Sequence, residues 1–240
     1  MSQTEKIKQA ISARPLFKDS RESFINALAE QGRIMQANKG QVLFMNMENA
    51  DKFFIIVSGW VKLYRETIDG AQAVVDILSA GHMFGETSIF EGDNYPYSAE
   101  ATENAELIVL PLSVLKKEID ESSDFARAML SAMARYRTQQ DRELEHRTLQ
   151  NASQRIGCFL LRLANQNQDG QVVINLPYDK SLVASRLGMQ PETFSRALSK
   201  LKKATGMEVS GATITMERLE SLSEYCCSAC SSNFPCKDIA

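Results

Sequence analysis

The sequence has few histidines and no long apolar run. Only two histidines occur among its 240 residues. It shows no Ser-His-Asp constellation, no P-loop and no dinucleotide-binding glycine motif, which argues against an enzyme. No apolar stretch approaches the ~20 residues needed to cross a bilayer, and residues 1–6 lack the apolar segment of a signal peptide. We therefore expect a cytoplasmic protein that is not an enzyme and has no membrane partner.

Basic residues are fewer than acidic ones, but they are unevenly spread. The chain has 27 Lys and Arg against 30 Asp and Glu, a net charge of −3. Residues 178–203 reverse this balance, with six basic and two acidic side chains. Because phosphate binding depends on where the charge lies, a local basic patch can operate on an acidic protein. The average charge therefore does not exclude a nucleic-acid partner.

The first half of the chain changes from a helical to a β-rich pattern near Lys39. Residues 5–36 are expected to be helical, with an interruption at Pro15. Short runs with glycines between them follow: Gln41–Met45, Phe53–Ser58, Trp60–Glu66, Ala73–Leu78, Ala99–Ala101 and Glu106–Leu110. Short strands at regular spacing indicate a small barrel or sandwich. Residues 1–118 are assigned to a sensing domain with this β-roll and N-terminal helices.

A long amphipathic helix is expected from Ser122 or Ser123 to about residue 148. One apolar stripe on so long a helix needs a partner surface. Packing within the monomer is one solution, and a coiled-coil seam between two chains is the favoured one. Residues 119–149 are therefore the expected dimerisation helix of a homodimer. The residues assigned to its interface are Phe125, Met129, Ala132, Met133 and Tyr136.

Residues 179–203 carry a helix-turn-helix pattern. Asp179 can cap a first helix, Gly188 suits a tight turn, and Pro191 suits the first position of a second helix. Residues 208–210 and 213–216 then read as a β-hairpin. Before this pattern, an amphipathic helix is expected over residues 151–168. Residues 150–225 are therefore expected to form a winged helix-turn-helix domain.

The second of these helices has two distinct faces. Four residues form the expected core side: Phe194, Ala197, Leu198 and Leu201. The opposite side is consistent with a solvated face carrying a Glu192–Arg196 pair. It is also consistent with a recognition helix, in which an arginine binds guanine O6 and N7 and a carboxylate accepts from cytosine N4. The candidate DNA-binding residues are Lys180, Glu192, Thr193, Ser195, Arg196, Ser199 and Lys200.

Two motifs in this order resemble the CRP/FNR family of bacterial regulators. They are Gly81-His82-Met83-Phe84-Gly85-Glu86, and Leu182-Val183-Ala184 followed by Gly188 and Glu192-Thr193-Phe194-Ser195-Arg196. The resemblance implies an α+β fold with a cyclic-nucleotide-binding-like β-roll (jelly roll), a long dimerisation helix and a C-terminal winged helix-turn-helix. It also implies a homodimeric transcriptional activator that binds double-stranded DNA, RNA polymerase, and a small-molecule or gaseous effector.

Within this family, the Glu-x-x-Ser-Arg spacing resembles the FNR type. That resemblance implies inverted repeats of the form TTGAT-N4-ATCAA, with Arg196 on the guanine, Glu192 on the opposite strand and Ser195 on a thymine. Residues 190–196 also look like the denitrification-regulator subgroup, which is associated with nitric oxide sensing through haem. His82 and His146 are then the only imidazole candidates for the iron.

The resemblance also places an effector pocket in the first domain. Its expected residues are Gly85, Glu86, Thr87, Tyr97, Ser98 and Tyr136. Relatives that bind cyclic nucleotides have an arginine where this chain has Tyr97. Tyrosine cannot give a phosphate the paired donors of a guanidinium, which argues against cyclic AMP.

Cysteine is scarce before the last fifteen residues. Cys158 is the only one there, which excludes the N-terminal iron–sulfur cluster of the oxygen-sensing relatives. Residues 226–240 hold the remaining four, Cys226, Cys227, Cys230 and Cys236. Such spacing can hold an iron–sulfur cluster or zinc, and an adventitiously oxidised tail is the alternative. Redox chemistry is thus a second candidate signal.

One alternative function is a cyclic-nucleotide-type ligand-binding module that acts through protein partners instead of DNA. Binding to DNA that weakens steeply with salt separates the two, because phosphate contacts release counterions.

Overall fold

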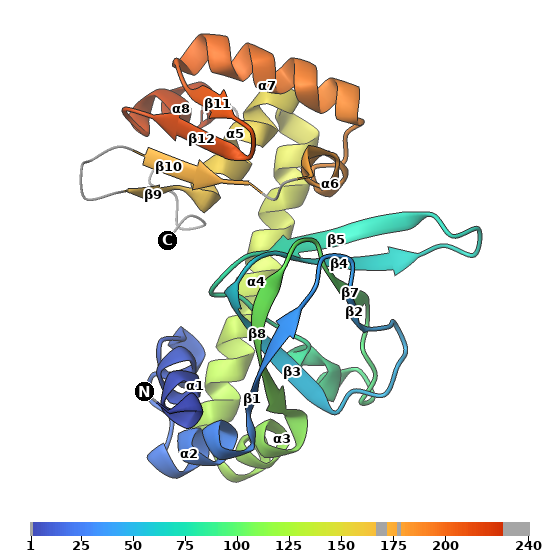
Figure 1. Cartoon of the computed structure of the whole chain (residues 1–240), viewed down its shortest axis with the longest axis vertical. Coiled ribbons are helices and arrows are strands. Elements are labelled where there is room, and N and C mark those ends of the chain that lie inside the picture. Colours follow the sequence, from blue (N-terminus) through green and yellow to red (C-terminus); the bar gives the residue numbers. More distant parts are fainter. Residues whose placement is uncertain (1, 167–171, 177–178, 228–240) are drawn as a thin grey trace. The chain divides into compact units, whose positions relative to one another are not determined.

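The chain divides into two compact units, which Figure 1 shows along the sequence from blue to red. This computed structural model describes residues 2–166, 172–176 and 179–227. The first unit covers residues 1–135 and the second residues 136–240. Each unit is described by itself below. Among the described residues, no helix combines the length and the apolar character that crossing a bilayer requires.

The first unit is a β-roll preceded and followed by short helices. Its elements are α1 (Gln3–Ser12), η1 (Pro15–Phe17), α2 (Glu22–Gln31), β1 (Arg33–Ala37), β2 (Val42–Phe44), β3 (Lys52–Ser58), β4 (Val61–Glu66), β5 (Gln72–Leu78), β6 (Met83–Phe84), η2 (Glu86–Phe90), β7 (Ser98–Ala101), β8 (Ala105–Pro111) and α3 (Leu112–Glu121). The strands form two antiparallel four-stranded sheets, ordered β1-β8-β3-β6 and β2-β7-β4-β5.

Strand β3 shows how the sequence builds this roll. Side chains alternate between the two faces of a strand. Phe54 and Ile56 accordingly face the second sheet and enter the core between the sheets. Phe53 and Ile55 face the other way and pack in a separate cluster with α1, α2 and α3. The sheet β1-β8-β3-β6 is thus covered on both faces at β3, which explains why β3 is a continuous apolar run.

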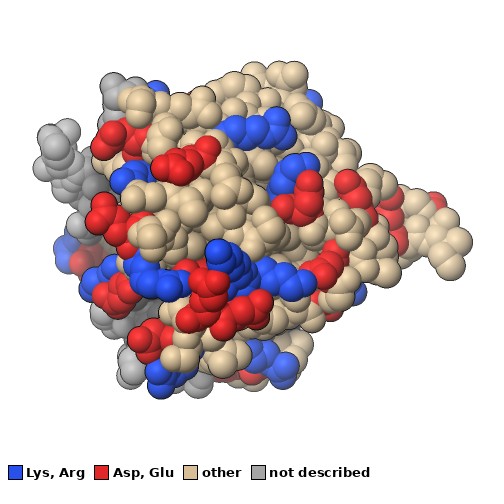
Figure 2. Space-filling model, turned by 90° about the horizontal axis from the view of Figure 1, so that it is seen from below, with Lys and Arg blue, Asp and Glu red and all other residues tan. Residues whose placement is uncertain are grey.

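Charge on the surface of the first unit is mixed in sign. Figure 2 shows the structure from below, and on that face acidic and basic side chains lie interspersed. Helix α3 illustrates this pattern, because its exposed Lys116 pairs with Asp93 at 3.0 Å and its exposed Lys117 pairs with Glu121 at 3.7 Å. Paired charges of this kind do not indicate a binding surface for phosphates.

The start of the sheet differs from the sequence-based prediction. Residues 33–36 were expected to belong to the N-terminal helical segment, but they lie in β1, which pairs with β8 from Arg33 to Ala37. The helix α2 ends at Gln31, and Gly32 has an extended backbone. Hydrogen bonding to β8 is a tertiary contact that helical periodicity cannot reveal.

The long helix α4 covers Ser123–Leu149, and its apolar residues have two different environments. Phe125 and Met129 are buried within the first unit, where Phe125 packs edge-on to Phe24 at 5.0 Å. These two positions of the expected dimer seam are therefore already covered by their own chain, and Ala132 is half-buried. The large apolar side chains that stay exposed on α4 are Leu130, Met133, Tyr136, Leu144 and Leu149.

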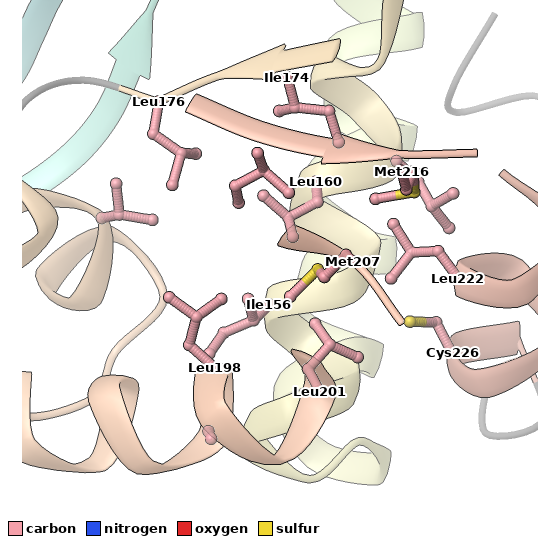
Figure 3. Packing of buried hydrophobic residues seen from close by; sticks show 14 of the residues in the cluster. Ile156, Leu160, Ile174, Leu176, Leu198, Leu201, Met207, Met216, Leu222 and Cys226 are labelled. Atoms are coloured by element: carbon pink, nitrogen blue, oxygen red, sulfur yellow. The ribbon is translucent and has the colours of Figure 1, made fainter. Parts of the chain in front are cut away.

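The second unit is a small helical domain with a four-stranded sheet. Besides the end of α4, it contains α5 (Ala152–Leu163), β9 (Asn165–Gln166), β10 (Val172–Asn175), α6 (Lys180–Arg186), α7 (Pro191–Thr205), β11 (Glu208–Ser210), β12 (Thr213–Met216) and α8 (Glu220–Cys226). The sheet order is β11-β12-β10-β9. Figure 3 shows its core, in which Ile156 and Leu160 of α5 meet side chains of α7, α8 and the sheet.

Two elements of this unit also differ from the sequence-based prediction. The α5 helix was expected to continue to Gln168, but it ends at Leu163, and residues 165–166 pair with β10. Helix α8 was not expected at all. Its signal was the spacing of Leu219, Leu222 and Cys226, which places all three on one face of a helix.

Candidate nucleic-acid interface

Local sequence signals fix the two helices α6 and α7 around a tight turn. The Asp179 carboxylate accepts the Ser181 backbone N–H at 2.9 Å and so caps α6. Gly188 follows α6 with φ of 64°, a left-handed conformation that favours glycine. Pro191 occupies the first turn of α7, where the missing N–H costs nothing. The predicted cap, turn and helix start are all confirmed.

Helix α7 has one buried face and one exposed face. Phe194, Ala197, Leu198 and Leu201 are buried in the core of the second unit. Burying one leucine or phenylalanine side chain stabilises the folded state by about 1.5–3 kcal/mol. Since these residues recur every three or four positions, the rotation of α7 about its axis is fixed. Glu192, Ser195, Arg196, Ser199 and Lys200 are all exposed as a result.

The exposed face is basic over most of its length. Ser195, Arg196, Ser199, Lys200 and Lys203 line one shallow depression along α7. In the part of the chain that the structure describes, neither Glu192 nor Arg196 has a hydrogen-bond or ion-pair partner. The alternative of a Glu192–Arg196 pair is therefore not formed, and both side chains remain available to a ligand.

The remaining candidates are placed less prominently. Thr193 and Lys180 are half-exposed, at the start of α7 and of α6. Ser199 donates its hydroxyl to the Ser195 carbonyl at 2.9 Å. A hydrogen bond of this kind leaves the Ser199 oxygen able to accept one more donor.

An ion-pair cluster that sequence reasoning missed holds α6 in place. Glu143, near the end of α4, lies between Arg162 of α5 and Arg186 of α6, at 2.6 Å from each. The Arg186 side chain is only 9% exposed, and the Glu143 carboxylate compensates its charge. In the sequence, Glu143 interrupts the apolar stripe of the long helix. No sequence pattern indicates that its partners are Arg162 and Arg186.

The two arginines decide the protonation of Glu143. Burial alone would raise the pKa of its carboxyl group, but the charges of Arg186 and Arg162 outweigh burial and hold the pKa below its usual value. The carboxylate is therefore charged near neutral pH and accepts from both guanidinium groups.

In the first unit, the expected effector residues lie around the start of η2. Gly85 has a left-handed backbone and accepts the Ser88 hydroxyl at 2.6 Å. The Glu86 residue is half-buried overall. Its Oε2 atom is fully buried and has no hydrogen-bond partner among the described residues. Burial raises the pKa of this carboxyl group. An unpartnered acceptor of this kind fits a hydroxyl or amide donor on a ligand. Thr87 beside it is half-buried.

The other expected effector residues do not complete a phosphate site. Tyr97 is half-buried and packs 6.1 Å from the Phe44 ring, and Ser98 is buried and accepts the Asn46 N–H at 2.9 Å. Neither supplies a cation, so the residues present do not fit the phosphate of a cyclic nucleotide. Tyr136 belongs to the second unit, so it is not placed relative to the others.

The residues expected as haem or metal ligands differ in their surroundings where the structure describes them. His82 is exposed, with its Nδ1 3.1 Å from the Ser79 carbonyl. His146 is half-buried in the second unit, where burial lowers its pKa. Cys226 is buried, Cys227 is half-buried, and Cys230 and Cys236 fall outside the described residues. Within residues 2–166, 172–176 and 179–227, no three His, Cys, Asp or Glu side chains are placed to hold one metal ion.

Comparisons with known proteins agree with this arrangement. A cyclic nucleotide-binding domain model matches residues 34–122, and a Crp-like helix-turn-helix domain model matches residues 154–225. The nitrogen fixation regulation protein FixK of Rhizobium meliloti is 31% identical over 189 residues, which cover 78% of this chain and 84% of FixK. The chain belongs to the CRP/FNR family of transcriptional regulators.

Two further proteins are similar to this CRP/FNR regulator over most of their length. The fumarate and nitrate reduction regulatory protein of Escherichia coli is 26% identical over 190 residues, covering 78% of this chain and 75% of that protein. A crystal structure from Ruegeria pomeroyi, of a protein to which cyclic nucleotide binding has been ascribed, is 32% identical. It covers 94% of this chain and 99% of that one, with a TM-score of 0.72.

Membership of the CRP/FNR family confirms the expected α+β fold and establishes the general function. The protein is a DNA-binding transcriptional regulator with an effector-binding domain. The family consists of transcription factors, which bind DNA typically as dimers, and not of enzymes.

The Glu143 cluster gives a first prediction. Replacing Glu143 with Gln removes the carboxylate charge that pairs with Arg162 and with the buried Arg186, and we expect a loss of about 3 kcal/mol in the free energy of unfolding at pH 7. A depressed carboxyl pKa stabilises the fold above the pKa of the unfolded chain, and this contribution is lost as the pH falls through the folded-state pKa. The difference between the two proteins should therefore shrink in acid, as measured by urea unfolding at several pH values.

Glu224→Gln is the matched control for this test, because Glu224 is an exposed carboxylate on α8 of the same unit. It should change the free energy of unfolding by no more than about 0.5 kcal/mol. An equal effect of both substitutions, or a Glu143→Gln effect that does not vary with pH, would contradict the role given to the cluster.

Proposed function

We propose that this regulator binds inverted repeats of the form TTGAT-N4-ATCAA as a homodimer, with one α7 helix in the major groove of each half-site. The observation that carries the proposal is the exposed face of α7, where the side chains of Arg196 and Glu192, near the N-terminal end, have no partner within the described part of the chain. The N-terminal part of a recognition helix is the part that reaches base edges.

Each side chain on this face suits a different contact. Arg196 can donate two hydrogen bonds to O6 and N7 of the guanine in TTGAT. Glu192 lies one helical turn earlier, where its carboxylate can accept from an amino group of cytosine or adenine on the opposite strand. Ser195 suits a neighbouring thymine. Lys200 and Lys203 lie farther along α7 and suit phosphates, which position the helix without reading sequence.

The exposed apolar residues of α4 support the homodimer. Leu130, Met133 and Leu144 are 63%, 36% and 64% exposed. With Arg137 and Gln140 between them, they follow alternating spacings of three and four residues, the pattern of a coiled-coil seam. Two polar positions in the seam lower its stability and fix its register. A two-fold dimer presents two α7 helices to half-sites about 34 Å apart along the DNA.

The signal is proposed to reach the DNA through the β-roll. Glu86 offers a buried acceptor, whereas Tyr97 stands where a phosphate would need a cation, so the proposed effector is a small uncharged or gaseous molecule. An effector acts only through its different affinity for the two states of the dimer. The proposed partners are DNA and RNA polymerase. The proposed location of the protein is therefore the cytoplasm.

Replacing Arg196 with Ala tests the base-reading role. We expect a loss of about 1–3 kcal/mol in binding free energy on the TTGAT repeat, which is about a 5- to 150-fold weaker Kd, because two hydrogen bonds to guanine are lost. On a repeat with that guanine replaced, the same substitution should have little effect. Fluorescence anisotropy with the two duplexes over a range of salt concentrations measures both values.

Two control variants sharpen this result. Lys203→Ala should weaken binding to both duplexes equally and make the salt dependence shallower by about one ion, because it removes a phosphate contact. Arg33→Ala removes an exposed arginine from the first unit and should leave both affinities unchanged. If Arg196→Ala behaves like Lys203→Ala, Arg196 contacts phosphate only. Binding to neither duplex would favour a module that acts through proteins.

The dimer seam gives another prediction. Replacing Leu130 with Glu puts two carboxylates at the seam of the dimer, and we expect the protein to sediment as a folded monomer at micromolar concentration. Its DNA affinity should fall with it, since one half-site then binds without the other. Ser131→Glu adds the same charge at the neighbouring exposed position and should leave the dimer intact. A Leu130→Glu protein that still sediments as a dimer would place the interface elsewhere.

A further inference from the structure

Two cysteines of the second unit lie side by side in the structure although they are far apart in the sequence. Cys158 is on α5 and Cys226 ends α8, two helices that pack against each other, and the Cys226 thiol is the first cause that lowers the pKa of Cys158. Figure 3 shows Cys226 pointing from α8 into the core. A Cβ atom at Gly157 would lie 1.9 Å from the Cys226 Sγ, so the glycine beside Cys158 is what lets this sulfur approach α5.

The two thiols differ in the way that a reactive pair requires. Cys226 is completely buried, whereas Cys158 is partly exposed. A side-chain hydrogen bond with Cys226 is the largest cause that lowers the pKa of Cys158, to about 7. Gln150, which donates to its sulfur at 3.2 Å, and the charge of Arg162 act in the same direction. A large share of Cys158 is therefore thiolate at neutral pH, and the thiolate is the nucleophilic form.

Cys158 also faces a small cavity of matching chemistry. The cavity measures about 40 Å³, enough for a molecule of the size of water or hydrogen peroxide. Two buried polar atoms of its lining residues, Gln150 Oε1 and Arg155 Nε, have no hydrogen-bond partner among the residues that the structure describes. They offer one acceptor and one donor to a small polar guest. The ionisable groups that line it are Glu143, His146, Arg147, Arg155, Arg162 and Arg186, and the four arginines outnumber the one carboxylate, so positive charge predominates.

We propose that Cys158 and Cys226 form a peroxide-sensitive thiol pair that closes to a disulfide between α5 and α8. In the first step the Cys158 thiolate attacks one peroxide oxygen. An S–O bond forms, the O–O bond breaks, and the leaving hydroxide takes up the proton released by Cys158 to become water. In the second step the Cys226 sulfur attacks the Cys158 sulfenic acid. An S–S bond forms, the S–O bond breaks, and the hydroxyl leaves as water with the proton of Cys226. Two thiols are oxidised and one peroxide is reduced to two waters.

The pair has a defined place next to the DNA-reading helix. Helix α8 packs against both α5 and α7. A disulfide would join α8 to α5 covalently, with its sulfurs about 2.05 Å apart. The chemistry of the pair does not depend on the DNA sequence proposed above, and only its regulatory meaning rests on that function.

The test uses the full chain with three substitutions, Cys227→Ser, Cys230→Ser and Cys236→Ser, which leave Cys158 and Cys226 as its only thiols. Reduced protein is treated with a small excess of hydrogen peroxide, and the thiols are counted after denaturation. We expect both thiols to be lost. Mass spectrometry should find the Cys158 and Cys226 peptides linked and two hydrogen atoms lighter than their sum. Non-reducing electrophoresis should show a single chain.

Two further variants assign the roles of the two sulfurs. With Cys226→Ser added, the disulfide cannot form and a Cys158 sulfenic acid should accumulate and be trapped by dimedone. With Cys158→Ser added, the buried Cys226 should stay reduced. Retention of both thiols, a link between two chains, or oxidation of Cys226 without Cys158 would each overturn the proposal. DNA binding of the reduced protein, measured in parallel, tests the proposed function separately.

Discussion

The buried stripe of α7 is the constraint on which the DNA-binding unit depends. Phe194, Leu198 and Leu201 must leave water together, and a rigid helix has only one rotation that allows this. The same rotation turns Glu192 and Arg196 outward. The position of the side chains that are proposed to read bases is thus set by hydrophobic burial on the opposite side of the helix, and the polar residues themselves contribute little to their own placement.

The electrostatics of this unit complement its packing. A single carboxylate, Glu143, compensates two guanidinium groups from two different helices, and one of them is almost completely buried. Burial of apolar surface is non-directional, whereas charged hydrogen bonds of 2.6 Å have a defined geometry. We infer that the apolar core gives the unit most of its stability and that the Glu143 cluster fixes where α6 lies. Because α6 leads into the turn before α7, the position of α6 affects where α7 presents the side chains that are proposed to read bases.

Features written in local sequence could be predicted, and features that depend on distant contacts could not. Asp179, Pro191 and the two faces of α7 are local signals, because caps, turns and helical periodicity act within a few residues. Strand β1 depends on pairing with β8, which lies about seventy residues away. The partners of Glu143 come from two other helices, and no spacing in the sequence reveals them.

Burial of an apolar stripe is similarly hard to apportion from sequence. Periodicity identified the apolar residues of α4, but it could not show that Phe125 and Met129 pack against their own chain. It also passed over Leu130, which the structure leaves exposed. The proximity of Cys158 and Cys226 depends on α8, an element that was not expected, and on Gly157, whose missing side chain gives the sulfur room.

Methylation interference on the inverted repeat tests most directly whether α7 reads the major groove. Dimethyl sulfate places a methyl group on guanine N7, the atom that Arg196 is proposed to bind. The account predicts that methylation of the guanine in each TTGAT half-site blocks binding by the natural protein, and that the Arg196→Ala protein loses this sensitivity. Unimpaired binding to the methylated guanine, or interference confined to adenine N3 in the minor groove, would contradict it.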